Sequence, residues 1–159
     1  MAKDLGSTVA DAYIGAAYIC GEGVSRDVDK GLQMLNGVID SDKSIEAMRL
    51  LGVLYSTGDG LERSPSKAIE LLESVATIGN VPVFSELADL YLDKDSDHYD
   101  ENKALNYLIK GSQQRDLDCV SMLIDRCSKG DITGLSTSEI EYWRTRYDEL
   151  DSLIFRYEW

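Results

Sequence analysis

Apolar residues recur along this chain with the spacing of helices. Between positions 44 and 57, Ala47, Leu51, Leu54 and Tyr55 fall on one face of a 3.6-residue period, and Ser44 precedes them as an N-cap. Comparable runs fill the rest of the chain, and no stretch makes a convincing strand. The pattern predicts an all-α protein with helices at 8–20, 28–39, 44–57, 65–78, 82–93, 101–114, 118–129 and 137–155.

Capping and turn residues support these boundaries. Side chains suited to an N-cap precede four further runs, at Asp27, Ser64, Asp100 and Ser136. Pro65 stands at a first helical position, where its missing N–H does no harm, and Glu139 completes a capping box with Ser136. The segments Gly21-Glu22-Gly23 and Gly58-Asp59-Gly60 provide the positive φ that tight turns between helices need.

The chain repeats itself at intervals of 37 and then 36 residues. Segment 15–24 matches segment 52–61, and segment 51–55 matches segment 87–91. A lysine recurs in register as Lys30, Lys67 and Lys103. The fourth copy departs from the pattern, because Arg126 and Cys127 occupy the positions of Leu90 and Tyr91. Terminal repeats are often atypical, since they cap the stack.

The repeated residues resemble the Sel-one-like repeat family, relatives of tetratricopeptide repeats. The resemblance covers roughly residues 10–128 and rests on Ala47, Leu51-Gly52, Tyr55, Gly58-Asp59-Gly60-Leu61 and Lys67-Ala68. The resemblance implies a right-handed superhelix in which the first helix of each repeat lines a concave face. It also implies a scaffold or binding function without catalysis. We expect a short α-solenoid in one domain, 1–159, with four repeats at roughly 8–43, 44–80, 81–116 and 117–135 and a C-terminal capping helix at 136–159.

The chain is strongly acidic. Acidic residues outnumber basic ones by 29 to 16, which gives a formal net charge of −13. Such a chain repels phosphate backbones and anionic lipid surfaces, so neither nucleic acid nor a membrane is an expected partner. Two interpretations of the charge stay open: it keeps the protein soluble, or it attracts a basic protein partner.

Three features favour a cytoplasmic location. No apolar run reaches the roughly 18 residues of a membrane-spanning helix. The first seven residues contain no apolar leader segment. The three cysteines fit a reducing compartment, because Cys119 and Cys127 stand too far apart along one predicted helix to form a disulfide.

The sequence offers no constellation for catalysis or metal binding. Asp93 to Asp97 resemble the start of an EF-hand calcium loop, but His98 and Ala104 stand where that loop needs glycine and glutamate. His98 is the only histidine and has no identifiable nucleophile as a partner. Cys119 and Cys127 fall at core positions of the repeat. We therefore expect a non-enzymatic protein without a metal or cofactor.

The tetratricopeptide resemblance implies that residues two and five positions to either side of Leu51, and their equivalents, line a groove. In repeat one these are Val9, Ala12, Ala16 and Ile19. The candidate partner-binding residues, with Asp93 added from the acidic stretch 86–101, are Arg49, Val53, Ser85, Asp89, Asp93, Asp118, Ser121 and Asp125. This face grades from apolar to acidic, which suits an amphipathic or basic segment, although an ordinary solvated helix is also mixed in character.

The C-terminal helix offers a second candidate surface. Its apolar stripe, predicted to cover the end of the stack, consists of Ile140, Trp143, Tyr147, Leu150 and Ile154. The candidates off this stripe are Tyr142, Arg146, Tyr157 and Trp159. Aromatic residues and arginine are enriched at interface hot spots, but the rings could equally pack internally.

Two functions fit a small, acidic binding module without catalytic residues. The first is a cytosolic inhibitor of one particular partner, such as an immunity protein that neutralises a basic bacterial toxin. The alternative is a scaffold or adaptor that holds several clients in a regulatory or secretion-related complex. We expect the free protein to be monomeric.

Overall fold

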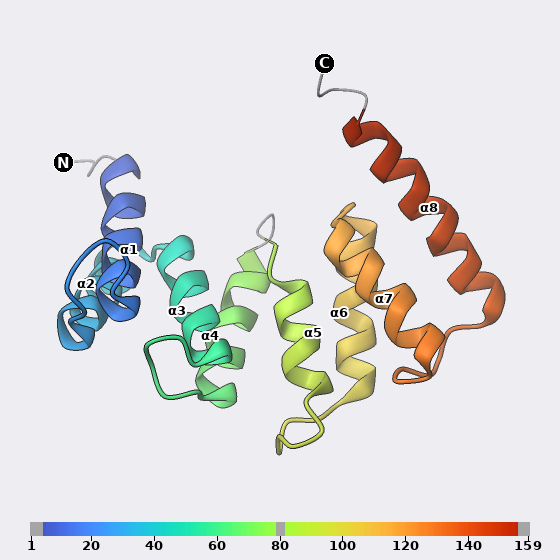
Figure 1. The fold of residues 1–159 in the computed structure, drawn as a ribbon, viewed down its shortest axis with the longest axis horizontal. Coiled ribbons are helices and arrows are strands. Elements are labelled where there is room, and N and C mark those ends of the chain that lie inside the picture. The colour runs from blue at the N-terminus through green and yellow to red at the C-terminus, as the bar shows by residue number, and fades with distance from the viewer. Residues whose placement is uncertain (1–4, 79–81, 156–159) are drawn as a thin grey trace. The chain divides into compact units, whose positions relative to one another are not determined.

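The computed structural model describes residues 5–78 and 82–155. Their helices are α1 (Leu5–Cys20), α2 (Val28–Asp42), α3 (Ile45–Thr57), α4 (Pro65–Ile78), α5 (Phe84–Leu92), α6 (Glu101–Gln113), α7 (Leu117–Lys129) and α8 (Thr137–Phe155), shown in Figure 1. The described residues contain no strand, so the all-α prediction is confirmed, and no helix end differs from its predicted position by more than three residues. None of the described helices combines the length and apolar character needed to cross a membrane.

The predicted N-caps at Asp27, Ser44, Asp100 and Ser136 hold their helices as expected. The carboxylates of Asp27 and Asp100 each accept a hydrogen bond of 3.0 Å from the backbone N–H three residues further on. The Ser44 hydroxyl accepts one of 3.3 Å at the start of α3. Ser136 and Glu139 form the predicted capping box, in which the backbone N–H of each donates to the side chain of the other.

The helices group into two compact units, 1–83 and 84–159. In the first unit α1 packs against α2 and α3 against α4, and α3 also contacts α1 and α2. In the second unit α5 packs against α6, α7 contacts both, and α8 packs on α7. Each unit is thus a stack of helical hairpins with its own core.

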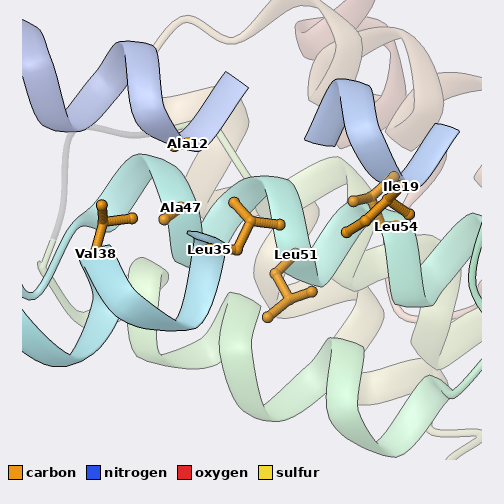
Figure 2. Packing of buried hydrophobic residues seen from close by; sticks show 7 residues of the cluster. All are labelled: Ala12, Ile19, Leu35, Val38, Ala47, Leu51 and Leu54. Atoms are coloured by element: carbon orange, nitrogen blue, oxygen red, sulfur yellow. The ribbon is translucent and has the colours of Figure 1, made fainter. Parts of the chain in front are cut away.

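The core of the first unit lies where α1, α2 and α3 meet. Figure 2 shows its members, Ala12, Ile19, Leu35, Val38, Ala47, Leu51 and Leu54. Leu51 is buried, as predicted, and Tyr55 packs against the cluster while partly exposed. The assignment of Ala12 and Ile19 to an open groove is wrong, because both are fully buried. Since α3 stacks on α1, these positions become the contact between successive repeats.

Glycine is required at two contacts of this unit. A Cβ on Gly52 would lie 2.8 Å from the Leu72 Cγ, so only glycine lets α3 and α4 approach this closely. Gly60 has a φ of +71°, and a Cβ there would lie 2.8 Å from the Ile19 Cγ2. The Arg26 side chain bridges the same contact, because it donates to the carbonyls of Ile19 and Gly60 at 3.0 and 2.7 Å. The turn of repeat two therefore fits tightly onto the end of α1.

One interaction explains why lysine and tyrosine recur in register. The lysine Nζ lies over the ring of the first-helix tyrosine, at 3.9 Å in Tyr18–Lys30, 4.8 Å in Tyr55–Lys67 and 4.7 Å in Tyr91–Lys103. The same three tyrosine carbonyls accept from the N-cap residue of the second helix, at 2.8 to 2.9 Å. The fourth repeat has Cys127 and Glu139 at the corresponding positions, so it lacks this clamp.

The second unit has a core of its own. Leu87, Leu90, Leu108 and Leu123 are almost fully buried. The Tyr107 ring stacks on those of Phe84 and Tyr91, with centroids 6.1 and 5.9 Å apart. Cys119 is fully buried, and this burial raises the pKa of its thiol far above the ordinary value. Cys119 is therefore a core residue, as predicted.

Candidate partner-binding site

A hollow between α5 and α7 brings five of the predicted groove residues together. It has a volume of about 520 Å³ and is lined by Ser85, Glu86, Asp89, Asp118, Ser121, Met122, Asp125 and Arg126. Ser85 and Asp89 come from α5, whereas Asp118, Ser121 and Asp125 come from α7. The repeat register therefore predicted correctly which side chains of the second unit share a face.

A neighbouring hollow lies between α7 and α8. It has a volume of about 490 Å³ and is lined by Ser121, Ile124, Asp125, Ser128, Arg144, Tyr147 and Asp148. Ser121 and Asp125 line both hollows, so the outer face of α7 runs between them. We call the two hollows together the α7 site. Its size is within the range of pockets that bind side chains and small ligands.

Carboxylates dominate the first hollow, which has four of them against one guanidinium. That guanidinium, of Arg126, lies 3.2 Å from Asp89 and 3.7 Å from Asp131. Asp125 pairs with Lys129 at 2.8 Å. These ion pairs are largely exposed, and pairs of this kind contribute only about 0–1 kcal/mol, so an incoming cation could replace them at small cost.

Two other acids of the α7 site are available for an external partner. Among the described residues, the carboxylates of Asp118 and Asp148 have no ion-pair or hydrogen-bond partner, and both side chains are exposed. The walls of the first hollow also desolvate Asp89, which raises the pKa of its carboxyl, and Arg126 opposes that rise. A basic side chain bound here would gain contacts with these carboxylates and stabilise Asp89 in its charged form.

Arg49 and Val53, the two groove candidates in the first unit, lie outside the α7 site. Arg49 is half-buried, and its guanidinium makes two hydrogen bonds to Glu46, at 3.2 and 2.7 Å. Glu46 also accepts a hydrogen bond of 2.7 Å from the Tyr13 hydroxyl. Val53 lies half-buried on the same helix. Arg49 is thus held by its own helix, and no described hollow of this unit contains it or Val53.

Asp93 lies outside the α7 site. It follows α5, and its carboxylate accepts a 3.1 Å hydrogen bond from the N–H of Asp95 within the loop. Other acids of this stretch are also used locally: Asp100 caps α6, and Glu101 accepts a 2.6 Å hydrogen bond from the Thr133 hydroxyl. The acidic stretch 86–101 is therefore divided between loop structure and the α7 site, which contains Glu86 and Asp89.

The C-terminal candidates are only partly within the described chain. Tyr142 is 60% exposed, and its ring meets that of Trp143 edge-on, with centroids 5.2 Å apart. Arg146 is half-exposed and pairs with Glu149 at 3.0 Å. Tyr157 and Trp159 lie outside the described residues, as do the side chains of Ile154 and Phe155. Of the predicted apolar stripe, Leu150 is buried and Ile140, Trp143 and Tyr147 are half-buried.

Sequence reasoning missed several residues of the α7 site. Arg126 gave a signal, because it is a charged residue at a position where earlier repeats have Leu54 and Leu90. Arg144, Tyr147 and Asp148 were not among the candidates, because the sequence placed Tyr147 in the apolar stripe that covers the stack and the second candidate surface off that stripe. The structure instead makes α8 a wall of the second hollow.

Two findings concern the metal-binding and nucleophilic side chains of the described residues. They contain no group of three or more histidine, cysteine or acidic side chains placed to hold a metal ion. Burial raises the thiol pKa of Cys20, Cys119 and Cys127, which disfavours the reactive thiolate. The arrangement of the α7 site is suited to binding charged groups.

Solved structures share the fold. The crystal structure of a Sel1 repeat protein from Oxalobacter formigenes matches with a TM-score of 0.72 and 19% identity, over 89% of this chain and 58% of that one. The structure of c5321, a protective antigen of uropathogenic Escherichia coli strains with an SLR fold, matches with a TM-score of 0.73 and 21% identity, over 91% of this chain and 31% of that one. This chain thus spans less than two thirds of either protein. No curated protein matches it in sequence.

The family comparison agrees with the repeats found in the sequence. The Sel1 repeat model matches residues 9–36, 45–80 and 87–116, which together make up more than half of the chain. The matched segments correspond to the hairpins α1–α2, α3–α4 and α5–α6, and the divergent fourth repeat is not among them. Sel1 repeats are modules of protein–protein interaction, and this chain belongs to the Sel1 repeat family.

Proposed function

We propose that this protein is a non-catalytic cytoplasmic inhibitor that binds a basic segment of one partner protein in the α7 site. The observation that carries the proposal is the pair of adjoining hollows on α7, where Asp118 and Asp148 have no partner among the described residues. A lysine or arginine side chain is the natural counterpart of such a surface. An immunity protein that neutralises a basic toxin is the function that this arrangement fits best, and we expect the free protein to be a monomer.

The net charge supports the same assignment. At −13 the whole molecule attracts a basic partner over longer distances, and the α7 site provides the contacts at short range. Salt screens exposed charges beyond about 8 Å at physiological ionic strength, so the carboxylates of the site matter more than distant ones. Fast, salt-dependent association is what an inhibitor of a harmful protein requires.

The test replaces the two unpartnered acids. Asp118→Lys with Asp148→Lys reverses the charge of the α7 site without breaking an ion pair of the described residues. The matched control is Asp40→Lys with Glu70→Lys, which makes the same change of net charge at exposed positions on α2 and α4. All three proteins are used as baits in an extract of the native host. We expect wild type and control to retain one basic protein, and the α7 variant to lose it.

Kinetics with the captured partner then sharpen the result. The α7 double variant should slow association roughly tenfold at low salt, with a smaller effect at high salt. Equal association rates for the two double variants would show that the acidity serves solubility alone. Complex stoichiometry separates the inhibitor from the scaffold: a stable one-to-one complex supports the inhibitor, whereas several weakly bound clients would favour the adaptor.

A further inference from the structure

A separate cleft of the second unit has the opposite charge. It lies between the C-terminal end of α6 and one face of α8, with a volume of about 270 Å³. Its walls are residues 112–115 on one side and Tyr142, Trp143 and Arg146 on the other. No acidic residue lines it, although the chain as a whole carries a net charge of −13.

Both guanidinium groups of this cleft can turn toward a ligand. Arg115 is exposed and has no ion-pair partner among the described residues. Arg146 pairs with Glu149 at 3.0 Å on the surface of α8, where the two side chains are 37% and 58% exposed. A surface pair of this kind is weak and exchanges readily for another anion.

The wall also contains a buried polar group without a partner. Ser112 is 3% exposed, and its hydroxyl makes no hydrogen bond within the described part of the chain. Buried hydroxyls are normally hydrogen-bonded, and leaving one unpaired destabilises a fold. Ser112 is one of the residues that line the cleft, so a polar group bound there would lie near this unpaired hydroxyl.

The backbone of Arg115 has a conformation that is uncommon for residues other than glycine. Its φ is +66°, in the left-handed region that favours glycine just past the end of a helix. The N–H groups of Arg115 and Asp116 close α6 by donating to the carbonyls of Ser112 and Gly111, each at 3.1 Å. Glycine would make this turn with less strain, so the turn itself does not require an arginine there.

We propose that this cleft is an oxyanion subsite that binds a carboxylate or phosphate group. The planar guanidinium groups of Arg115 and Arg146 match the oxygen geometry of such groups. The amides of Gln113 and Gln114 are further donors in the wall, and Trp143 provides an apolar flank. The cleft is smaller than most ligand pockets, so it takes one anionic group of side-chain size. This inference goes beyond the proposed function and does not depend on the α7 site.

Two probes distinguish the source of the oxyanion. Inorganic phosphate and N-acetylglutamate are titrated separately into the ¹⁵N-labelled protein, against sodium chloride at equal ionic strength. We expect saturable shifts in the amide signals of residues 111–116 and in the Trp143 indole N–H. Saturation by phosphate alone assigns the site to phosphate groups, and saturation by N-acetylglutamate alone assigns it to protein carboxylates. Shifts that are no larger in the cleft than elsewhere, with either probe, would overturn the proposal.

The variants separate binding from folding. Arg115→Gly should raise the dissociation constant at least about tenfold, while the melting temperature stays the same or rises because the strain is removed. Lys43→Gly is the matched control: Lys43 ends α2 with a φ of 51° and lines none of the described hollows, so the variant should bind as wild type does. Arg146→Gln should also weaken binding. Unchanged affinity in both Arg115→Gly and Arg146→Gln would show that the cleft is not the binding site.

Discussion

The two units use the same helical hairpin but join successive repeats in different ways. In the first unit a glycine turn packs directly on α1, and Arg26 ties Gly60 to the end of that helix through backbone carbonyls. In the second unit charged side chains make the connection. Lys94 lies 3.7 Å from Asp131, and Glu101 accepts hydrogen bonds from Thr133. The first unit keeps the repeat consensus, whereas the second departs from it in the turn of repeat three and in repeat four, and carries both candidate sites.

The departure has a physical consequence for the surface. In repeats one and two the segments 21–27 and 58–64 join the helices through glycines with a positive φ. Repeat three has the segment 93–100 in their place, which contains no glycine and is one residue longer, and repeat four has lost the tyrosine and lysine of the clamp. In the fourth repeat, polar side chains stand where the earlier repeats have conserved packing residues. Polar side chains also line the two hollows beside α7. The proposed binding surfaces thus lie where the repeat has diverged.

The largest effect should come from the core of the first unit. Leu51 is 4% exposed and belongs to the cluster in Figure 2. Leu51→Ala should lower the free energy of unfolding by about 2–5 kcal/mol, the usual range for truncation of a buried leucine. Chemical denaturation measures this loss. A loss below about 0.5 kcal/mol would contradict the helix register, since that is the scale of surface substitutions.

A matched pair of glycines isolates the contact between repeats. Gly23 and Gly60 both have a φ of +71°, but a Cβ at Gly23 would meet nothing within 4 Å, whereas one at Gly60 would meet Ile19. Alanine should cost about 1–2 kcal/mol at either position for the backbone. Gly60→Ala should lose about 1–3 kcal/mol more, because the inserted methyl overpacks the contact. Equal losses in thermal denaturation would show that the turn of repeat two does not depend on α1.

Most of the fold could be predicted from the sequence, because it depends on local patterns. Helix periodicity, the caps at Asp27, Ser44 and Asp100, and the repeat register do not require knowledge of distant contacts. The same register correctly grouped Asp89 with Asp118 and Asp125, since equivalent positions of α5 and α7 face the same way. Family resemblance then supplied the order of stacking.

The errors arose where stacking, and not periodicity, determines exposure. Ala12 and Ile19 occupy the same repeat positions as Arg49 and Ser56, yet only the first two are fully buried. Apolar side chains at these positions let α3 pack closely on α1. The part of α8 in the second hollow was missed for a similar reason, since the approach of a capping helix leaves no mark in a repeat alignment.

A substitution that restores the repeat's usual leucine in α7 tests the difference between the two units further. Arg126→Leu places in α7 the residue that α3 and α5 have at this position. Because the Arg126 pairs are partly exposed, we expect a change in the free energy of unfolding within about 1 kcal/mol. The variant should nonetheless associate faster with a basic partner, because the first hollow loses its only cation. Slower association would show that Arg126 itself contacts the partner.

The smallest effect concerns the side-chain connection in the second unit. Hydrogen bonds from the hydroxyl and backbone N–H of Thr133 hold the pKa of Glu101 below its ordinary value of 4.5. The folded state therefore favours the charged carboxylate, and this stabilisation is present above pH 4.5 and is lost as the pH falls through the folded-state pKa. The free energy of unfolding of Glu101→Gln should thus lie below that of wild type at neutral pH, and the two should converge in acid. Thr133→Val should lower the free energy of unfolding less in the Glu101→Gln background than in wild type, because an amide oxygen is a weaker acceptor than a carboxylate. The free energies of unfolding of wild type and Glu101→Gln are compared from pH 7 to pH 3. If their difference stays constant over this range, the connection between the loops after α5 and α7 does not depend on the charge of Glu101.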